Sequence, residues 1–222
     1  MNRRLEITAG RLIALIIGIP VCLIIIGLVA VSEVAEAGQG SYPVGLSIPV
    51  QGRSVTIGLD SGSLHVAPAT DDYLRLRGIA RYALVRSAVS WRVTSGGVTV
   101  ESHCHFPSMI CQFDYHAAIP AAVREDLSVG KGDITAAGLT NLIVSAASGS
   151  GDITLTFIRV PERVSIQDAF GNVTVVLPPG RTAYKVSVQA ALGMTSVTGP
   201  TSPTSAHVIT VVDSSGNIWI KR

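Results

Sequence analysis

The sequence lacks an excess of charge of either sign beyond its first eleven residues. Those eleven residues hold three arginines and one glutamate, and the formal net charge of the whole 222-residue chain is +2. From residue 12 onward, 14 basic residues are balanced by 14 acidic ones. A protein that binds nucleic acid through its phosphates needs a basic surface, so this balance excludes that class of partner.

Short catalytic motifs are absent as well. The chain holds no G-x-S-x-G nucleophile elbow, no phosphate-binding loop, no H-E-x-x-H zinc motif and no dinucleotide-binding fingerprint. We therefore expect no catalytic residues, no cofactor and no metal, and a protein that is not an enzyme. After residue 31 the sequence also lacks an apolar period of 3.6 residues, which excludes a helical domain there.

One long apolar run lies near the start of the chain. Residues 12–31, LIALIIGIPVCLIIIGLVAV, carry no charge and are long enough for a transmembrane helix. Three arginines precede the run, so the positive-inside rule predicts a cytoplasmic tail of residues 1–11 and an extracytoplasmic remainder. The predicted localisation is the cell membrane, with a single pass. The alternative is a cleaved signal peptide, because AEA at 35–37 fits a cleavage site.

Two segments follow the apolar run. Residues 32–52 are rich in Gly, Ser and Pro and predict an extracytoplasmic stalk. Residues 53–222 alternate apolar with polar side chains in many short stretches, which predicts an all-β head.

A glycine phrase recurs through this head. Gly132, Gly151, Gly171, Gly193 and Gly216 are 19, 20, 22 and 23 residues apart. A fixed period of about twenty residues is typical of a solenoid, whose units stack and share one core. We therefore predict a parallel β-solenoid (a β-helix) of right hand. Its repeat corners are Gly132, Asp133, Gly151, Asp152, Gly171, Asn172, Gly216 and Asn217.

The solenoid hypothesis makes further predictions. The glycines should lie over one another in a column, since glycine takes a positive φ at a corner without a Cβ clash. Ile153, Leu155 and Phe157 should point inward from their strand. Gly193 is followed by Met194, where the acid or amide is missing, so this unit departs from the pattern. An antiparallel sandwich, whose hairpins also use glycine, is the alternative.

The three cysteines fall into two compartments. Cys22 lies in the apolar run, whereas Cys104 and Cys111 lie in the extracytoplasmic part, where disulfides persist. We predict that Cys104 and Cys111 form a disulfide. The alternatives are free thiols and a metal site that includes His103 and His105. The metal site is disfavoured, because consecutive residues of a strand point to opposite faces.

Two carboxylates are expected to approach each other at the corners. If the coils stack in register, Asp133 and Asp152 lie about 5 Å apart. Such a pair could have one raised pKa, act as an acid–base couple or hold a calcium ion. The other hypothesis is that both only cap their corners. Asn172 and Asn217 favour it, because they fill the equivalent positions without a charge.

An arginine cluster precedes the cysteine pair. Its members lie within eighteen residues and are Arg75, Arg77, Arg81, Arg86 and Arg92. With Asp71 and Asp72 beside them, they predict a solvated strand face. The sharper hypothesis is a patch that binds anionic envelope polymers or lipid headgroups.

The order of these features resembles one known family. A membrane span, a stalk and a cysteine pair are followed by YHAAIPAAVREDLSVGKGDITAAGLTNLIVSAASGSGDITLTF, by GNVTVVLPPG and by a terminal SSGNIWIKR. Over residues 53–222 this order resembles the bacterial putative-adhesin family of β-strand-repeat proteins. The resemblance implies a β-solenoid head on the cell surface, with no established enzymatic activity and no catalytic residues to transfer.

These observations together predict a membrane-anchored protein that acts in adhesion, scaffolding or ligand display in the bacterial envelope. The expected partners are the membrane, through residues 12–31, and an envelope glycan, lipid or protein ligand. One alternative function is a polysaccharide-active β-helix enzyme, for which Asp133, Asp152 and Lys131 are the nearest approach to a catalytic cluster. Another is an envelope-stress signalling component whose eleven-residue tail recruits a partner.

Overall fold

The computed structural model describes residues 39–106 and 110–222, and the regular elements in this part of the chain are all β-strands. The predicted tail, the predicted membrane span and the first residues of the predicted stalk lie outside the described residues. Within the described ranges, no helix is long and apolar enough to cross a membrane. The prediction of an all-β fold with mostly parallel strands is confirmed for the head.

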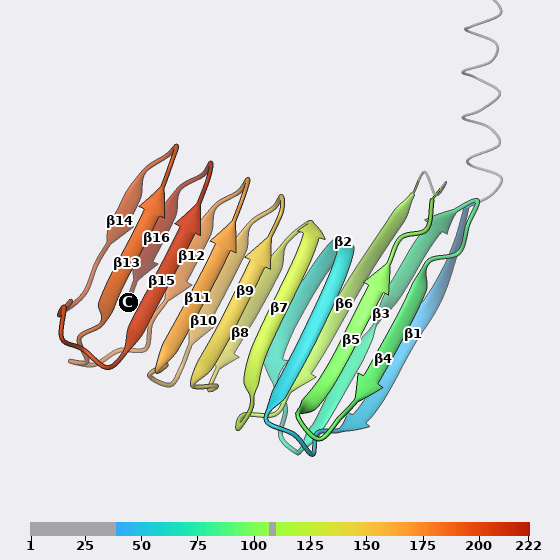
Figure 1. Cartoon of the computed structure of the whole chain (residues 1–222), viewed down its shortest axis with the longest axis horizontal. Coiled ribbons are helices and arrows are strands. Elements are labelled where there is room, and N and C mark those ends of the chain that lie inside the picture. The colour runs from blue at the N-terminus through green and yellow to red at the C-terminus, as the bar shows by residue number, and fades with distance from the viewer. Residues whose placement is uncertain (1–38, 107–109) are drawn as a thin grey trace, which may run out of the picture. The chain divides into compact units, whose positions relative to one another are not determined.

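One sheet of sixteen strands in the described residues folds back on itself, so that two layers face each other (Figure 1). The strands are β1 (Gln39–Pro49), β2 (Ser54–Pro68), β3 (Tyr73–Ala83), β4 (Ala88–Val93), β5 (Gly97–His103), β6 (Cys111–Ile119), β7 (Arg124–Lys131), β8 (Ile134–Leu139), β9 (Ile143–Ser148), β10 (Ile153–Phe157), β11 (Arg163–Asp168), β12 (Val173–Val176), β13 (Lys185–Ala190), β14 (Thr195–Val197), β15 (Val208–Asp213) and β16 (Ile218–Lys221). The first layer holds β4, β5, β7, β9, β11, β13 and β15, and the second layer holds β1, β3, β6, β8, β10, β12, β14 and β16. The long strand β2 joins the layers, because its first half pairs with β5 and β7 and its second half with β6 and β8.

Each coil consists of one strand in each layer, and in the coils from β7–β8 to β15–β16 a glycine corner lies between the two strands. The pairing between successive coils is parallel and continuous. In the second layer, Ile153 pairs with Ile134 on one side and with Val173 on the other. In the first layer, Val164 pairs in the same way with Val144 and Ile209. Because parallel strands in register place like residues side by side, each inward position becomes a row that runs through the stack.

The coils do not stack in the order of the sequence, and this corrects the simple succession that the glycine spacing suggested. The coil β15–β16 lies between β11–β12 and β13–β14. At the other end, β2 lies between β5–β6 and β7–β8. At both places the chain leaves one position of the stack empty, and a segment distant in sequence fills it.

The first part of the head departs from parallel pairing. Strand β3 is antiparallel to β6, and β4 is antiparallel to β5. Strand β1 pairs with β3, although its residues fall within the segment 32–52 that was expected to be a stalk. Apolar side chains at every second position, among them the buried Val44 and Ile48, explain why this Gly- and Pro-containing segment joins the sheet.

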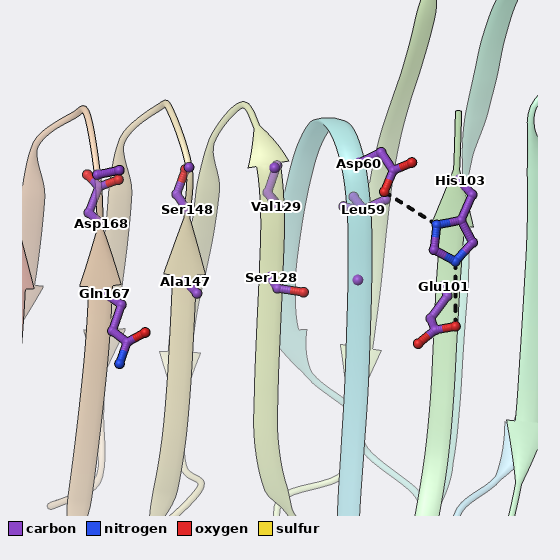
Figure 2. A pocket seen from close by; sticks show the side chains of 14 residues that line it. Leu59, Asp60, Glu101, His103, Ser128, Val129, Ala147, Ser148, Gln167 and Asp168 are labelled. Carbon is purple, nitrogen blue, oxygen red and sulfur yellow. Dashed lines mark hydrogen bonds and ion pairs between the residues drawn. The ribbon is translucent and has the colours of Figure 1, made fainter. Parts of the chain in front are cut away.

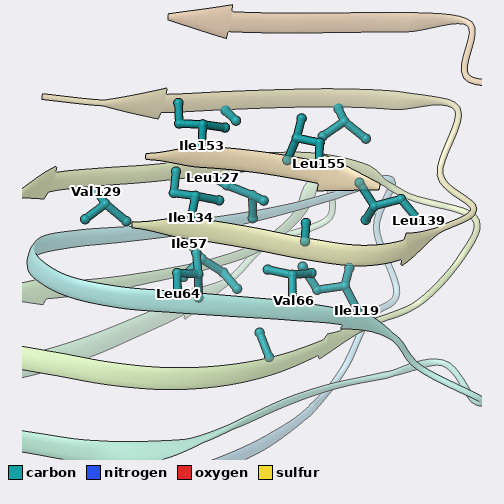
Figure 3. Close-up of a cluster of buried hydrophobic side chains, with 14 of the residues drawn as sticks. Ile57, Leu64, Val66, Ile119, Leu127, Val129, Ile134, Leu139, Ile153 and Leu155 are labelled. Carbon is teal, nitrogen blue, oxygen red and sulfur yellow. The ribbon is translucent and has the colours of Figure 1, made fainter. Parts of the chain in front are cut away.

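Aliphatic side chains fill the space between the layers (Figure 3). Ile153, Leu155 and Phe157 are buried, as predicted. Ile153 belongs to a register-matched row with Leu64 and Ile134 of the preceding coils. A single coil could not bury such a row, so stability depends on the contact between neighbouring coils.

The carboxyl group of Glu125 lies inside this core. Glu125 of β7 is 1% exposed, and its register partners are Val55 and Val144. Its Oε2 atom has no hydrogen-bond partner. Burial raises the pKa of Glu125 to about 8, because the charged form loses its hydration without gaining a counter-charge.

We predict that this carboxyl group makes stability fall as the pH rises. Between pH 4.5 and about 8 the unfolded chain ionises Glu125 while the folded chain keeps its proton, so folding takes up a proton in that window. The loss reaches at most about 5 kcal/mol at pH 8. Glu125→Gln should remove it, so that the variant exceeds the natural protein in stability at pH 8 and matches it near pH 4.5.

Denaturant unfolding at both pH values measures this difference. The control variant is Glu162→Gln, because the Glu162 side chain is exposed and this substitution should leave the pH dependence in place. An equal gain for Glu125→Gln at both pH values would show that burial does not suppress ionisation.

We also predict that the glycine corners tolerate no side chain. Gly151 has a φ of 136°, and a Cβ there would overlap the carbonyl group of Gly132 in the preceding coil. Gly151→Ala should therefore lower the free energy of unfolding by about 3 kcal/mol or more. Gly45→Ala is the matched control, because nothing lies within 4 Å of a Cβ at Gly45. Equal stability of the two variants would contradict the corner geometry.

Candidate functional site

An open groove of about 550 Å³ crosses the outer surface of the first layer close to the corners (Figure 2). It runs over β5, β2, β7, β9 and β11. Its floor is the register-matched series Gly58, Ser128 and Ala147. Because these side chains are small, the floor stays low between two walls of longer polar side chains.

One wall, here called the near wall, lies on the β5 side of the groove and is formed by Asp60, Glu101 and His103. The Nδ1 atom of His103 lies 3.4 Å from Oδ1 of Asp60, and its Nε2 atom lies 3.5 Å from Oε2 of Glu101 (Figure 2). The N–H of Cys104 donates a hydrogen bond of 2.8 Å to Oδ2 of Asp60. The imidazole therefore bridges two carboxylates, and the wall offers hydrogen-bond acceptors to the groove.

The predicted disulfide between Cys104 and Cys111 is confirmed, and it follows this wall directly. Its Cα atoms are 5.7 Å apart, and it closes the loop from β5 to β6. Both sulfur atoms are used in this bond, so neither is available to the alternative metal site with His103 and His105. Within residues 39–106 and 110–222, no group of three or more His, Cys, Asp or Glu side chains could hold a metal ion.

The far wall is formed by Gln167 and Asp168 of β11. The amide of Gln167 lies over the groove, whereas the Asp168 carboxyl group turns into the corner and is 5% exposed (Figure 2). Neither carboxyl oxygen of Asp168 makes a regular hydrogen bond, and Asp213 lies beside it in register. Burial, and secondarily the neighbouring Asp213, raises the pKa of Asp168 to about 6.

The predicted corner residues lie on the edge of the stack. Gly132, Gly151 and Gly171 form a column in which the carbonyl group of each occupies the position of a Cβ on the next. Gly216 and then Gly193 continue the column. They follow in this order because the coil β15–β16, which contains Gly216, lies between β11–β12 and β13–β14.

The acid or amide after each glycine caps the neighbouring coil. The N–H of Asp152 donates to Oδ1 of Asp133, and the N–H of Asn172 donates to Oδ1 of Asp152, each at 2.8 Å. The N–H of Asn217 donates to Oδ1 of Asn172 at 3.2 Å. The Oδ1 atoms of Asp133 and Asp152 are thus engaged with backbone groups, an arrangement that the capping hypothesis requires and a calcium site does not.

The departure at Met194 has a structural reason. The N–H of Met194 completes the series of caps by donating to Oδ1 of Asn217 at 2.9 Å. Among the described strands, β14 lies at the edge of the second layer, so a side chain at 194 has no N–H of a further described coil to cap. A capping acid or amide is needed only where another coil follows in the stack.

The five clustered arginines do not form one patch. Arg75 pairs with Asp71, Arg81 pairs with Asp114, and the guanidinium of Arg86 lies 4.0 Å from the centre of the Tyr42 ring. The hydrogen bond from Arg75 lowers the pKa of Asp71 below its usual value. The remaining members, Arg77 and Arg92, lie in different layers.

Hydroxyl side chains cover much of the remaining outer surface. In the second layer, Thr135, Thr154 and Thr174 are register-matched, and in the first layer Ser145 and Ser165 continue such a row. These rows spread evenly over the strands, whereas carboxylates, an imidazole and an amide converge at the groove.

Of the residues in the groove walls, only His103 was singled out from the sequence, as a candidate metal ligand, and the others were not predicted. Asp60 and Glu101 come together because β2 and β5, far apart in sequence, pair in parallel, and no local pattern reveals this. Asp168 could have been found. It precedes Gly171 by three residues, Asp213 precedes Gly216 by the same spacing, and this Asp-x-x-Gly pattern marks a carboxyl group that turns into the corner.

Comparison with known proteins gave a likeness of fold. No family model and no curated protein matches the chain. A putative cell adhesion protein from Clostridium sporogenes superposes with a TM-score of 0.58 and 16% identity, over 82% of this chain and 99% of that one. This likeness shows a shared fold, and it confirms the resemblance to the putative-adhesin family at the level of the fold.

More distant structures were also found. A putative adhesin from Bacteroides fragilis gives a TM-score of 0.38 and 10% identity, over 82% of this chain and 97% of that one. A putative lipid binding protein from Parabacteroides distasonis gives a TM-score of 0.22 and 8% identity, over 81% of this chain and 96% of that one.

The cap at Asp152 is predicted to need an acceptor oxygen and no charge. Asp152→Asn should change the free energy of unfolding by less than about 0.5 kcal/mol, because Asn172 already fills the equivalent role. Asp152→Ala leaves the N–H of Asn172 without its partner and should cost about 1–2 kcal/mol. Thermal unfolding of the two variants measures this, and an equal loss in both would point to a role for the charge.

Proposed function

We propose that the protein is a membrane-anchored cell-surface protein with an adhesin-like role, and that the groove on the first layer binds a glycan of the bacterial envelope. The observation that carries this proposal is the groove itself. Its low floor admits a flat, extended ligand, and its walls offer carboxylates and an amide to hydroxyl groups. Such a mixture of a few convergent polar groups in a concave surface is typical of ligand sites.

The dimensions of the groove suit an extended chain better than a single small molecule. From Glu101 on β5 to Gln167 on β11 there are four strand spacings of about 4.8 Å, or roughly 19 Å. The acceptors at the two ends could bind separate units of one oligosaccharide.

Binding without turnover is the second part of the proposal. A glycosidase holds its two carboxyl groups about 5–9.5 Å apart across the scissile bond. Here the His103 imidazole fills the space between Asp60 and Glu101, so no bond of a ligand could lie between these two carboxylates. Asp168 lies on a strand roughly 14 Å beyond β2. This spacing supports a binding groove.

The cellular placement rests on two independent features. The uncharged run 12–31, preceded by arginines, supports a single-pass anchor with its N-terminus in the cytoplasm. The Cys104–Cys111 disulfide supports an oxidising, extracytoplasmic location for the head. We further infer that the stacked coils form a parallel β-solenoid of right hand, because crossovers between parallel strands almost always take that hand.

The proposal is tested on an array of bacterial surface glycans with the full-length protein in detergent. We expect binding of at least one glycan class, and Ala147→Phe, which fills the groove floor, should weaken it by about tenfold or more. Ser187→Phe on β13 is the control, because it adds the same ring to the same layer outside the groove. No glycan bound, or equal binding by both variants, would contradict the proposal, and release of cleaved sugar would overturn its non-enzymatic part.

A further inference from the structure

Three apolar side chains are exposed together where β3 and β5 end and β6 begins. We call Leu84, Phe106 and Ile110 the apolar tip; their exposed fractions are 45%, 97% and 36%. The Cys104–Cys111 disulfide holds the two ends of the Phe106 loop, with Cα atoms 5.7 Å apart. The N–H of Ala83, next to Leu84, donates to the carbonyl oxygen of Ile110 at 2.9 Å.

The backbone at Leu84 is strained. Its φ is 69°, and it is the one non-glycine residue of the described ranges with a positive φ. Glycine, asparagine or aspartate adopts this conformation at lower cost than leucine. The Leu84 side chain is nevertheless exposed, so burial within the head does not compensate the strain.

The surroundings of the apolar tip have the composition of a membrane interface. The rings of Tyr42 and Tyr82 lie 6.1 Å apart, and the exposed guanidinium of Arg86 covers the Tyr42 ring. Tyr82 pairs in register with Cys111 at the start of β6. Tyrosine and arginine next to exposed apolar side chains are typical of the headgroup layer, where one part of a side chain is apolar and the other hydrated.

The described chain begins at this same end. Gly40 of β1 packs against the ring of Tyr82, which a Cβ at Gly40 would approach to 2.6 Å. Figure 1 shows the beginning of β1 next to the end of β3. Seven residues, 32–38, separate the apolar run from β1 and span at most about 25 Å. An anchor at 12–31 would therefore join the head at the end that carries the apolar tip.

We infer that the apolar tip inserts into the headgroup layer of the membrane that holds the anchor, with Arg86 near the lipid phosphates. This inference rests on the proposed anchor. Insertion would bury Leu84, Phe106 and Ile110, which the head itself leaves exposed, and would fix the orientation of the head on the cell surface.

Quenching by brominated lipid tests the inference in the full-length protein. Trp91 and Trp219, both exposed, are replaced by Phe, and one new tryptophan is introduced by Phe106→Trp. The control is Phe170→Trp, an exposed position on the corner of β11–β12. Both proteins are reconstituted into vesicles of phosphatidylcholine and phosphatidylglycerol, with plain or brominated acyl chains.

We expect brominated lipid to remove about half or more of the fluorescence at position 106 and little at position 170. Vesicle flotation separates the two hypotheses. If the protein floats with vesicles but quenching is equal at both positions, insertion of the apolar tip is overturned and the proposed anchor stands. A protein that does not float overturns the anchor, and this inference with it.

Leu84→Asn supplies a second measurement in the background that carries Phe106→Trp. Asparagine accepts the positive φ, so the thermal midpoint of the head should stay the same or rise. Quenching of the tryptophan introduced at position 106 should nevertheless decrease, because one apolar group is lost. A lower thermal midpoint would show that Leu84 stabilises the fold instead. Unchanged quenching would show that Leu84 does not contact the membrane.

Discussion

The whole stack depends on the close approach of backbone at its corners. Along one edge, the carbonyl group of each corner glycine occupies the space that a Cβ on the next would need. This contact lets consecutive coils keep the ordinary spacing of paired strands while the chain turns between the layers. At Gly132 and Gly151 the φ values of 130° and 136° lie where a side chain would also be strained. The corner sets the register, and the register aligns both the aliphatic rows inside and the polar rows outside.

The same register builds the groove. Gly58, Ser128 and Ala147 form a floor because they are partners in three neighbouring parallel strands. Asp60 begins the corner of β2, and its carboxylate accepts the N–H of Cys104, so the disulfide and the groove wall are parts of one local arrangement. A site of this kind needs no loop insertion, since the regular stack itself brings the side chains together.

Much of the local structure could be predicted from the sequence because corners have local chemistry. A glycine followed by Asp or Asn and by alternating apolar residues specifies a turn and a strand, as at Gly151 and Asp152. The disulfide followed from compartment and spacing. Even the departure at Met194 was visible, although its meaning, the end of the stack, was not.

The order of the coils could not be predicted in this way. Strands β13 and β15 both alternate apolar with polar residues, and either would pair with β11 equally well by pattern alone. The groove walls were missed for the same reason, since Asp60 and Glu101 meet only through the insertion of β2 between later strands. The candidate site is thus a product of long-range strand pairing, which local sequence patterns do not predict.

Cross-linking across the exchanged coils tests this account most directly. Ser165 pairs with Thr210, and Thr210 pairs with Ser187, so Ser165 and Ser187 lie two strands apart. In a Cys22→Ser background, a thiol reagent of short reach should bridge Ser165→Cys to Thr210→Cys and leave the pair Ser165→Cys and Ser187→Cys unbridged. A bridge from position 165 to 187 in place of 165 to 210 would mean that the coils follow the sequence and would contradict the stack described above.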